Sequence, residues 1–264
     1  MTVVVVLATP PRSGLVCPEL ESESPLSAAE AADLYAAALA DTLVTAEQAG
    51  GDLLVNYRGP ETIPEAFHTE TEPAAEVRAL ASEALSDVTA ARFEPQVGSS
   101  PSARVGNTVT HLLREEEADS VSVLWPTAPL VRRSNVDSAA MKLRSSATVL
   151  GPATGGGVWY AGFTDPPAFD EALSSPAVET LTDRARDADH DVDFLPSQPA
   201  VDSAAGLRSV VPLVRSQVRA ERAVPVETAT FVHEHGLRVR DGTLVRDETD
   251  GDRVAIDGDG DATE

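Results

Sequence analysis

Seven residues at the start of the chain, Thr2–Ala8 (TVVVVLA), constrain its fold more than any other segment. The run is uninterrupted, apolar and rich in β-branched valine, so it predicts a strand buried on both faces. Ser27 and Glu30 have the spacing of a capping box, which predicts a helix over 28–49. A further apolar segment at 52–57 predicts a second strand. Together these segments predict a right-handed β-α-β unit with two parallel strands.

The same alternation continues to about residue 224. Strands are predicted at 90–94, 121–125, 148–150, 158–163 and 192–195, and helices at 74–85, 102–117, 135–144, 176–189 and 203–223. Repeated strand–helix alternation is typical of an α/β domain in which helices cover both faces of a mainly parallel sheet.

The end of the chain differs in composition. Residues 241–264 contain nine acids and two arginines, with glycines spaced among aspartates. Such a segment predicts a weak hairpin at best, followed by a flexible acidic tail. We therefore predict one domain over 1–240, with its core at 2–224, and a tail over 241–264.

The charge of the chain restricts its partners and its solvent. There are 43 acids against 20 bases, a net charge of −23, and Lys142 is the single lysine. Such a surface repels nucleic acid and anionic membranes. Its self-repulsion is screened in molar salt, where the Debye length is about 3 Å. The composition therefore predicts a halophilic, haloarchaeal-type protein, with an ordinary acidic protein as the alternative.

Targeting signals and cysteine content indicate a cytoplasmic protein. No apolar run approaches the roughly 20 residues of a membrane-spanning helix. The N-terminus lacks the basic region of a signal peptide. The single cysteine, Cys17, excludes an intrachain disulfide and a cysteine-based zinc cluster.

Three segments that follow predicted strands are candidates for ligand binding. In open α/β sheets, ligands bind outside the carboxyl ends of the strands. The segments are Thr9–Gly14, Trp125–Pro129 and Gly151–Gly157. In the first, Arg12 offers a guanidinium group and Ser13 adjoins backbone N–H donors suited to phosphate. Each segment also has a purely structural alternative. The first is a plain turn, the second is a strand exit fixed by prolines, and the third is a glycine turn. No nucleophile-elbow or P-loop spacing occurs, so no catalytic residue is assigned.

The three segments, in this order, carry a family resemblance. The first reads ATPPRSGLVCPEL over 8–20, against a family pattern A-K-x-P-x-P-G-x-V-K-T-R-L. The third reads GPATGGGVWYAGF over 151–163, against G-P-A-E-D-G-G-Y-Y-L-I-G-L. Weaker matches lie at 26–35, 102–107 and 200–207. The chain thus resembles the GT-A-fold nucleotide-diphospho-sugar-transferase-like family, an uncharacterised transferase family related to 2-phospho-L-lactate and molybdenum-cofactor guanylyltransferases.

This resemblance, which covers about residues 2–224, implies a GT-A-like, Rossmann-like three-layer sandwich with a mixed sheet. It also implies a nucleotide or nucleotide-sugar ligand, with Mg²⁺ or Mn²⁺ bound by Asp202. The residues that it places near the nucleotide or its phosphates are Ala8, Pro11, Arg12, Ser13, Gly14, Arg104, Thr127, Gly156 and Gly157.

The chain departs from the family at charged positions. The family's loop lysines fall on Thr9 and Cys17, and the aspartate of its G-S-D-C-P motif falls on Thr127. The acidic pair of the third segment is Thr154-Gly155, so Asp202 is the one remaining carboxylate. Two hypotheses follow. The chain is either a divergent nucleotide-sugar or nucleotidyl transferase, or a noncatalytic pseudoenzyme that binds a ligand or a protein.

Overall fold

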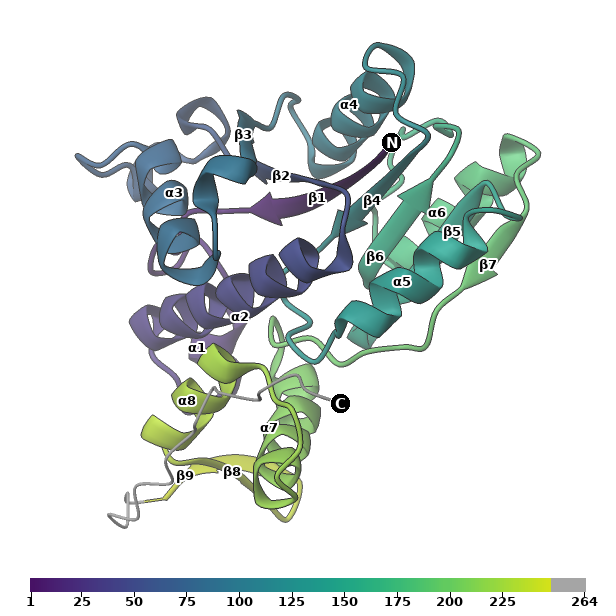
Figure 1. The fold of residues 1–264 in the computed structure, drawn as a ribbon. Coiled ribbons are helices and arrows are strands. Elements are labelled where there is room, and N and C mark those ends of the chain that lie inside the picture. The colour runs from purple at the N-terminus through teal and green to yellow at the C-terminus, as the bar shows by residue number, and fades with distance from the viewer. Residues whose placement is uncertain (248–264) are drawn as a thin grey trace.

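The computed structural model describes residues 1–247 and shows an α/β fold (Figure 1). Its main sheet has seven strands in the order β3-β2-β1-β4-β6-β5-β7. The bounds of these strands are β1 (Thr2–Ala8), β2 (Asp52–Tyr57), β3 (Arg92–Pro95), β4 (Ser120–Leu124), β5 (Thr148–Pro152), β6 (Val158–Phe163) and β7 (Val192–Phe194). Strand β6 runs antiparallel to both of its neighbours, and all other pairs in this sheet are parallel. The mainly parallel mixed sheet is therefore confirmed.

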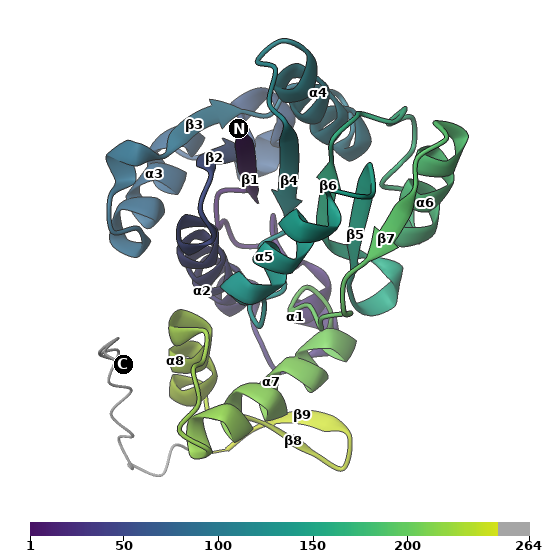
Figure 2. The same ribbon diagram turned by 45° about the vertical axis from the view of Figure 1, so that its right-hand side comes forward.

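Helices cover both faces of this sheet (Figure 2). Their bounds are α1 (Glu19–Glu23), α2 (Ala28–Ala49), α3 (Pro73–Ala84), α4 (Pro101–Arg114), α5 (Arg133–Lys142), α6 (Ala177–Asp187), α7 (Ala204–Arg219) and α8 (Val226–Glu234). Alternate residues of β1 belong to two separate cores: Val4 and Val6 pack with α2, α3 and α5, whereas Val3 and Val5 pack with α4 and α6. This arrangement is the predicted three-layer sandwich.

The first β-α-β unit agrees with its sequence prediction in detail. Strands β1 and β2 pair in parallel. Ser27 accepts a hydrogen bond from the backbone N–H of Glu30, and the Glu30 carboxylate accepts one from the backbone N–H of Ser27. Gly50 ends α2 at a φ of 75°. The capping box fixes where the helix begins, and the glycine allows the left-handed backbone at its end.

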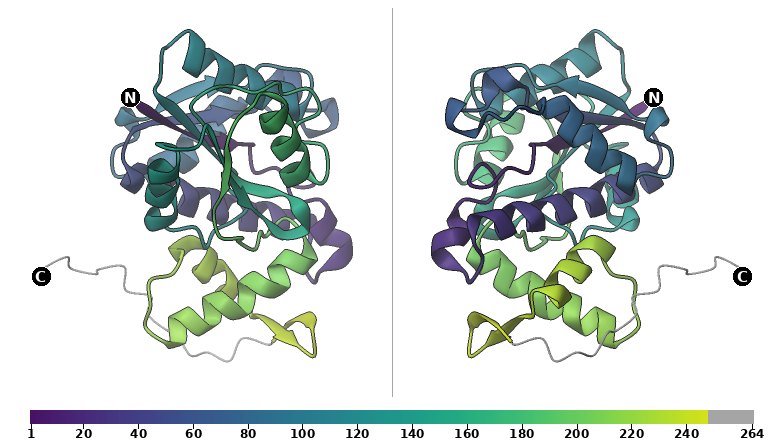
Figure 3. Two further views of the ribbon diagram at one scale, coloured as in Figure 1. Left: turned by 90° about the vertical axis from the view of Figure 1, so that its right-hand side faces the viewer. Right: turned by 90° about the vertical axis from the view of Figure 1, so that its left-hand side faces the viewer.

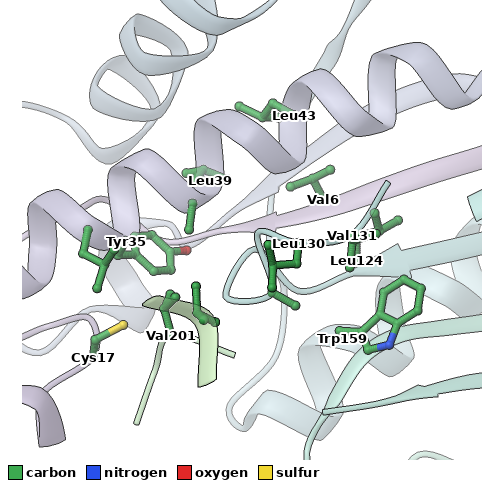
Figure 4. Packing of buried hydrophobic residues seen from close by; sticks show 14 of the residues in the cluster. Val6, Cys17, Tyr35, Leu39, Leu43, Leu124, Leu130, Val131, Trp159 and Val201 are labelled. Atoms are coloured by element: carbon green, nitrogen blue, oxygen red, sulfur yellow. The ribbon is translucent and has the colours of Figure 1, made fainter. Parts of the chain in front are cut away.

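The large aromatic residues of β6 determine the packing beside β5. Trp159 is buried, and its Nε1 donates to the carbonyl of Pro196 at 3.2 Å (Figure 4). A Cβ on Gly151 would lie 2.4 Å from the Trp159 ring, so this glycine is required for the ring to fit. Ser122 of β4 and Tyr160 hydrogen-bond through their hydroxyl groups at 2.7 Å on the buried sheet.

The C-terminal part of the described chain contains a helix that the sequence analysis missed. Helix α8 and the hairpin of β8 (Leu237–Arg240) and β9 (Thr243–Arg246) lie beside α7 (Figure 3). Asp41 of α2 accepts hydrogen bonds from the backbone N–H groups of Glu227 and Thr228, at 3.1 and 2.9 Å. A carboxylate from another helix therefore caps the N-terminus of α8.

The hairpin extends across the domain boundary predicted at residue 240, because β9 lies at 243–246. The rest of the predicted acidic tail, residues 248–264, lies outside the described residues. Within residues 1–247, no helix combines the length and apolar character needed to span a membrane.

Candidate functional site

The carboxyl ends of β1 and β2 and the segment after β3 are held together by backbone hydrogen bonds. The N–H of Arg58 donates to the carbonyl of Ala8 at 2.9 Å, and the N–H of Gln96 donates to that of Tyr57 at 2.7 Å. Similar backbone hydrogen bonds hold the segments that follow β4 and β5. The N–H of Val201 donates to the carbonyl of Thr127 at 2.7 Å.

The β5–β6 turn joins the same edge through Thr154, whose Oγ1 accepts from the N–H of Ala200 at 3.3 Å. The predicted segments Trp125–Pro129 and Gly151–Gly157 are therefore brought to the residues that precede Asp202. This edge is where open α/β sheets bind ligands.

Two arginines form a cationic end of this edge. Arg58 follows β2 directly, and Arg104 lies in the first turn of α4; both are half-buried. Burial lowers the pKa of both guanidinium groups, and the charge of Arg58 lowers the pKa of Arg104 further. Arg104 Nε donates to Gln96 Oε1 at 3.0 Å. The two positive charges are thus close neighbours.

Arg58 has few partners within the protein. One terminal nitrogen donates to the carbonyl of Thr62, and its Nε is buried without a hydrogen-bond acceptor among the described residues. A buried donor without an acceptor costs about 1–3 kcal/mol. Sequence reasoning missed this residue, although its position directly after the predicted strand at 52–57 was a usable signal.

Tyr35 and Cys17 belong to the same buried cluster as Val201 (Figure 4). The Tyr35 hydroxyl accepts a hydrogen bond from the backbone N–H of Thr9 at 3.0 Å. Burial raises the pKa of Tyr35 to about 12, and this hydrogen bond opposes the change. Burial, with a smaller effect of Asp202, raises the pKa of the Cys17 thiol to about 12. Cys17 is therefore a neutral thiol near pH 7 and a poor nucleophile.

Asp202 marks an acidic end of the edge. Its side chain remains partly open to solvent, yet the surrounding protein raises the pKa of the carboxyl group by desolvation. The hydrogen bond from Thr127 opposes this change, and the negative charge of Glu19 reinforces it. The pKa effects link these groups in pairs: Arg58 with Arg104 and with Tyr35, Cys17 with Tyr35, and Asp202 with Cys17. We call Arg104, Arg58, Tyr35, Cys17 and Asp202 the edge row.

The residues around Asp202 do not make a metal site by themselves. Within residues 1–247, no group of three or more His, Cys, Asp or Glu side chains is placed to hold a metal ion. Asp202 and Glu19 supply two carboxylates, and Mg²⁺ requires near-octahedral coordination by oxygen. A metal ion here would need waters and ligand phosphates for most of its coordination.

Arg12, predicted to meet phosphate, already has partners within the protein. Its Nε and one terminal nitrogen contact the Glu76 carboxylate, with a shortest distance of 2.7 Å. Its terminal nitrogens also donate to the carbonyls of Phe67 and Thr71, at 2.7 and 3.0 Å. Only 8% of Arg12 is exposed. This guanidinium group joins the loop after β1 to the segment before α3.

The other predicted residues of the first loop have mixed surroundings. Ala8 is buried, Pro11 is half-buried and Ser13 is exposed. Gly14 has a φ of 75°, and a Cβ there would lie 3.2 Å from the Phe67 ring. The glycine is therefore explained by backbone conformation, with no ligand required.

The glycine run after β5 forms the turn to β6. Gly155 and Gly156 have φ values of 71° and 81°. A Cβ on Gly156 would lie 2.7 Å from Cβ of Pro176, whereas a Cβ on Gly157 would contact only atoms at 3.5 Å or beyond. Turn geometry accounts for Gly155 and Gly156, and Gly157 has room for a neighbouring group.

A large groove lies away from the edge row. Its volume is about 1100 Å³, and it is lined by residues of α2, α3 and α8 and by the segment that includes Leu130 and Arg132. None of the predicted site residues lines it. This large groove therefore does not coincide with the candidate ligand site at the carboxyl ends of the strands.

Comparisons with known proteins support the fold. No protein-family model and no curated protein matches the chain. Among solved structures, the chain is similar to Rv0371c of Mycobacterium tuberculosis H37Rv in complex with manganese (TM-score 0.43, 17% identity, 79% of this chain and 96% of that chain). It is also similar to CMP:2-keto-3-deoxy-manno-octonic acid synthetase complexed with CTP (TM-score 0.43, 13% identity, 82% and 99%).

A stronger similarity is to a nucleotide-diphospho-sugar transferase-like protein from Desulfovibrio desulfuricans G20. The TM-score is 0.70 at 18% identity, over 89% of this chain and 94% of that chain. The sequence prediction is thereby confirmed at the level of the fold: the chain has the α/β architecture of nucleotide-diphospho-sugar transferase-like proteins.

Proposed function

We propose that the chain binds a nucleotide or nucleotide-sugar along the edge row, as a divergent member of the nucleotidyl and nucleotide-sugar transferases. The observation that carries this proposal is the row itself, with two half-buried arginines at one end and a carboxylate at the other. A nucleoside diphosphate carries both anionic phosphates and polar sugar and base groups. The protein from Desulfovibrio desulfuricans G20 that the chain resembles in fold is named for this class of ligand.

Within this proposal, five of the predicted residues have a defined part. Arg104 lies at the phosphate end, Thr127 and Asp202 lie at the opposite end, and Gly157 offers close backbone approach. Arg12 acts indirectly, by holding the loop after β1 against α3. Mg²⁺ or Mn²⁺ would be bound by Asp202 together with water and any ligand oxygens that reach it, where it would neutralise negative charge.

A noncatalytic, ligand-binding protein is the second candidate function. Transfer reactions at phosphate need positioned positive charge near the atoms where negative charge develops. The family resemblance places a metal-binding carboxylate where this chain has Thr127, so a metal ion that would supply positive charge has one ligand fewer. This difference favours binding over transfer chemistry.

Calorimetric titration in molar KCl tests the proposal. GTP, CTP, UTP and nucleotide-sugars are each added with and without Mg²⁺ or Mn²⁺. Molar KCl follows from our further proposal that the protein works in a high-salt cytoplasm, for which its charge of −23 is suited. Binding of at least one of these ligands supports the proposal, and failure of every ligand to bind the folded protein contradicts it.

The variant Asp202→Asn separates the two candidate functions. If a metal ion is bound through Asp202, the variant loses the metal-dependent part of the affinity. If binding is metal-independent and unchanged by the variant, the noncatalytic function is favoured. An assay for release of pyrophosphate or nucleoside diphosphate then shows directly whether the protein catalyses transfer.

A further inference from the structure

Arg58 and Arg104 differ from the other arginines in their surroundings. Nine arginines form ion pairs within the described residues; they are Arg12, Arg92, Arg114, Arg133, Arg184, Arg186, Arg238, Arg240 and Arg246. Most of the remaining arginines in that part of the chain are exposed to water. Arg215 is half-buried and lies near Arg238 and Arg219, but the carboxylate of Asp247 also lies near it. Arg58 and Arg104 are half-buried and have no ion pair with any described residue. Gln96 connects their positions: it accepts from Arg104 Nε at 3.0 Å, and its Nε2 donates at 2.8 Å to the carbonyl of Asn56, two residues before Arg58.

This arrangement is unfavourable for the protein alone. Partial burial of a cation removes hydrating water, and a second cation beside it adds repulsion. The chain contains 43 acids, so carboxylates are abundant. The Arg12–Glu76 pair, at 2.7 Å, shows how the same fold supplies a carboxylate to a buried arginine one strand away. At Arg58 and Arg104 an anion from outside would serve that purpose.

The hydrogen-bond donors of the two side chains give the same indication. Each guanidinium group carries five N–H donors. The described acceptors are the carbonyl of Thr62 for Arg58 and Oε1 of Gln96 for Arg104. The Nε of Arg58 has no acceptor among the residues that the structure describes. Phosphate oxygens, like carboxylate oxygens, match the forked donors of a guanidinium group.

Neighbouring groups place this pair on the ligand side of the sheet. Arg58 follows the last residue of β2, and its N–H is bonded to the last residue of β1. The Tyr35 hydroxyl, which raises the pKa of Arg58, accepts a hydrogen bond from the N–H of Thr9 in the loop after β1. Asp202 lies at the far end of the edge row. At the end of the edge row that contains Arg58 and Arg104, the positive charge available to an anion therefore comes from arginine.

We propose that Arg58 and Arg104 form a binding site for a phosphate-bearing anion, and that this site holds its ligand without a divalent metal ion. The proposal deepens the function proposed above by naming the part of the ligand that these residues bind. The phosphate group belongs either to a nucleotide or to free pyrophosphate, and the test separates the two sources.

The test is calorimetric titration of the full chain with inorganic pyrophosphate in molar KCl containing EDTA. We expect binding in EDTA, with little change when Mn²⁺ replaces EDTA. Arg104→Gln and Arg58→Gln should each weaken the affinity about tenfold or more, since bonds between charged groups contribute about 1.5–3 kcal/mol. Arg144→Gln is the matched control. Arg144 is exposed and lies just before β5, at the amino ends of the parallel strands, whereas Arg58 follows the carboxyl end of β2. This control should leave the affinity unchanged.

Folding of each variant is checked by thermal melting before titration. Arg58→Lys provides a second test if Arg58→Gln fails to fold, because it keeps the charge and loses the forked donors. It should bind pyrophosphate more weakly than the original chain. Absence of pyrophosphate binding, binding that requires Mn²⁺, or affinities unchanged in both glutamine variants would each overturn the proposal.

Parallel titrations with UTP, GTP and their nucleosides distinguish this proposal from the proposed function. If pyrophosphate binds through the two arginines and no nucleotide binds, the anion site stands and the nucleotide function fails. If nucleotides bind only with Mn²⁺ and independently of both arginines, the nucleotide function stands and the anion site fails. Tighter binding of a nucleotide than of pyrophosphate identifies the nucleotide as the source of the phosphate.

Discussion

The buried carboxyl group of Asp41, which accepts hydrogen bonds from α8, predicts a pH dependence of stability. Burial raises the pKa of Asp41 from its ordinary value of 3.8 to about 6; the charge of Glu227 adds to this, and hydrogen bonds from Thr228 and Glu227 oppose it. The folded protein therefore binds this proton more tightly than the unfolded chain. The stabilisation is complete below about pH 3.8 and is lost as the pH rises through about 6.

The magnitude follows from the same pKa values. The interval from 3.8 to about 6 corresponds to roughly 3 kcal/mol, at 1.36 kcal/mol for each pH unit. Asp41→Asn removes the titrating group and keeps one oxygen acceptor for α8. Relative to this variant, the original chain should gain up to roughly 3 kcal/mol between pH 7.5 and pH 4.

Denaturant unfolding in molar KCl at several pH values measures this difference. Comparison with the variant cancels the titration of the other acids, which both chains share. Asp33→Asn, on the exposed side of the same helix, is the control and should show no comparable change. A stability difference between the original chain and Asp41→Asn that stays constant with pH, or changes in the opposite direction, would refute the reasoning.

Three further predictions concern packing and charge. Gly151→Ala should destabilise the protein by about 1–3 kcal/mol in denaturant unfolding, because the new methyl group meets Trp159, whereas Gly157→Ala should have little effect. Arg12→Met should cost about 3 kcal/mol by leaving Glu76 without its partner, and limited proteolysis should then cleave the connection between β2 and α3 more rapidly. The melting temperature of the original chain should rise between low and molar KCl, and a constant value would contradict the halophilic interpretation.

Elements with local signals were predicted well from the sequence. Helix α2 begins and ends where the capping box and Gly50 predicted, because both signals act within one turn of the helix. Strands β1 and β6 also have the predicted bounds, since their apolar runs are bounded by turn residues. In each case, the residues that determine the element are its immediate neighbours.

Helix α8 shows why other elements could not be predicted. Its nine residues follow Pro225, and no side chain of its own caps the first turn. The acceptor for its N-terminal N–H groups is Asp41, 186 residues earlier in the chain. A short helix stabilised by a distant carboxylate leaves no pattern in its own sequence.

The two arginines that follow neighbouring strands show the same limit at the candidate site. Arg12 and Arg58 each come shortly after a parallel strand, and sequence reasoning selected Arg12 for phosphate. The fold gives Arg12 a carboxylate from α3 and gives Arg58 a second cation, Arg104. Whether an arginine after a strand is structural or available to a ligand is thus decided by its partner, and the partner lies in another element. The same reasoning applies to Asp202: Glu19 is the other carboxylate that acts on it, and two carboxylates leave most of the coordination of a metal ion to waters and to the ligand.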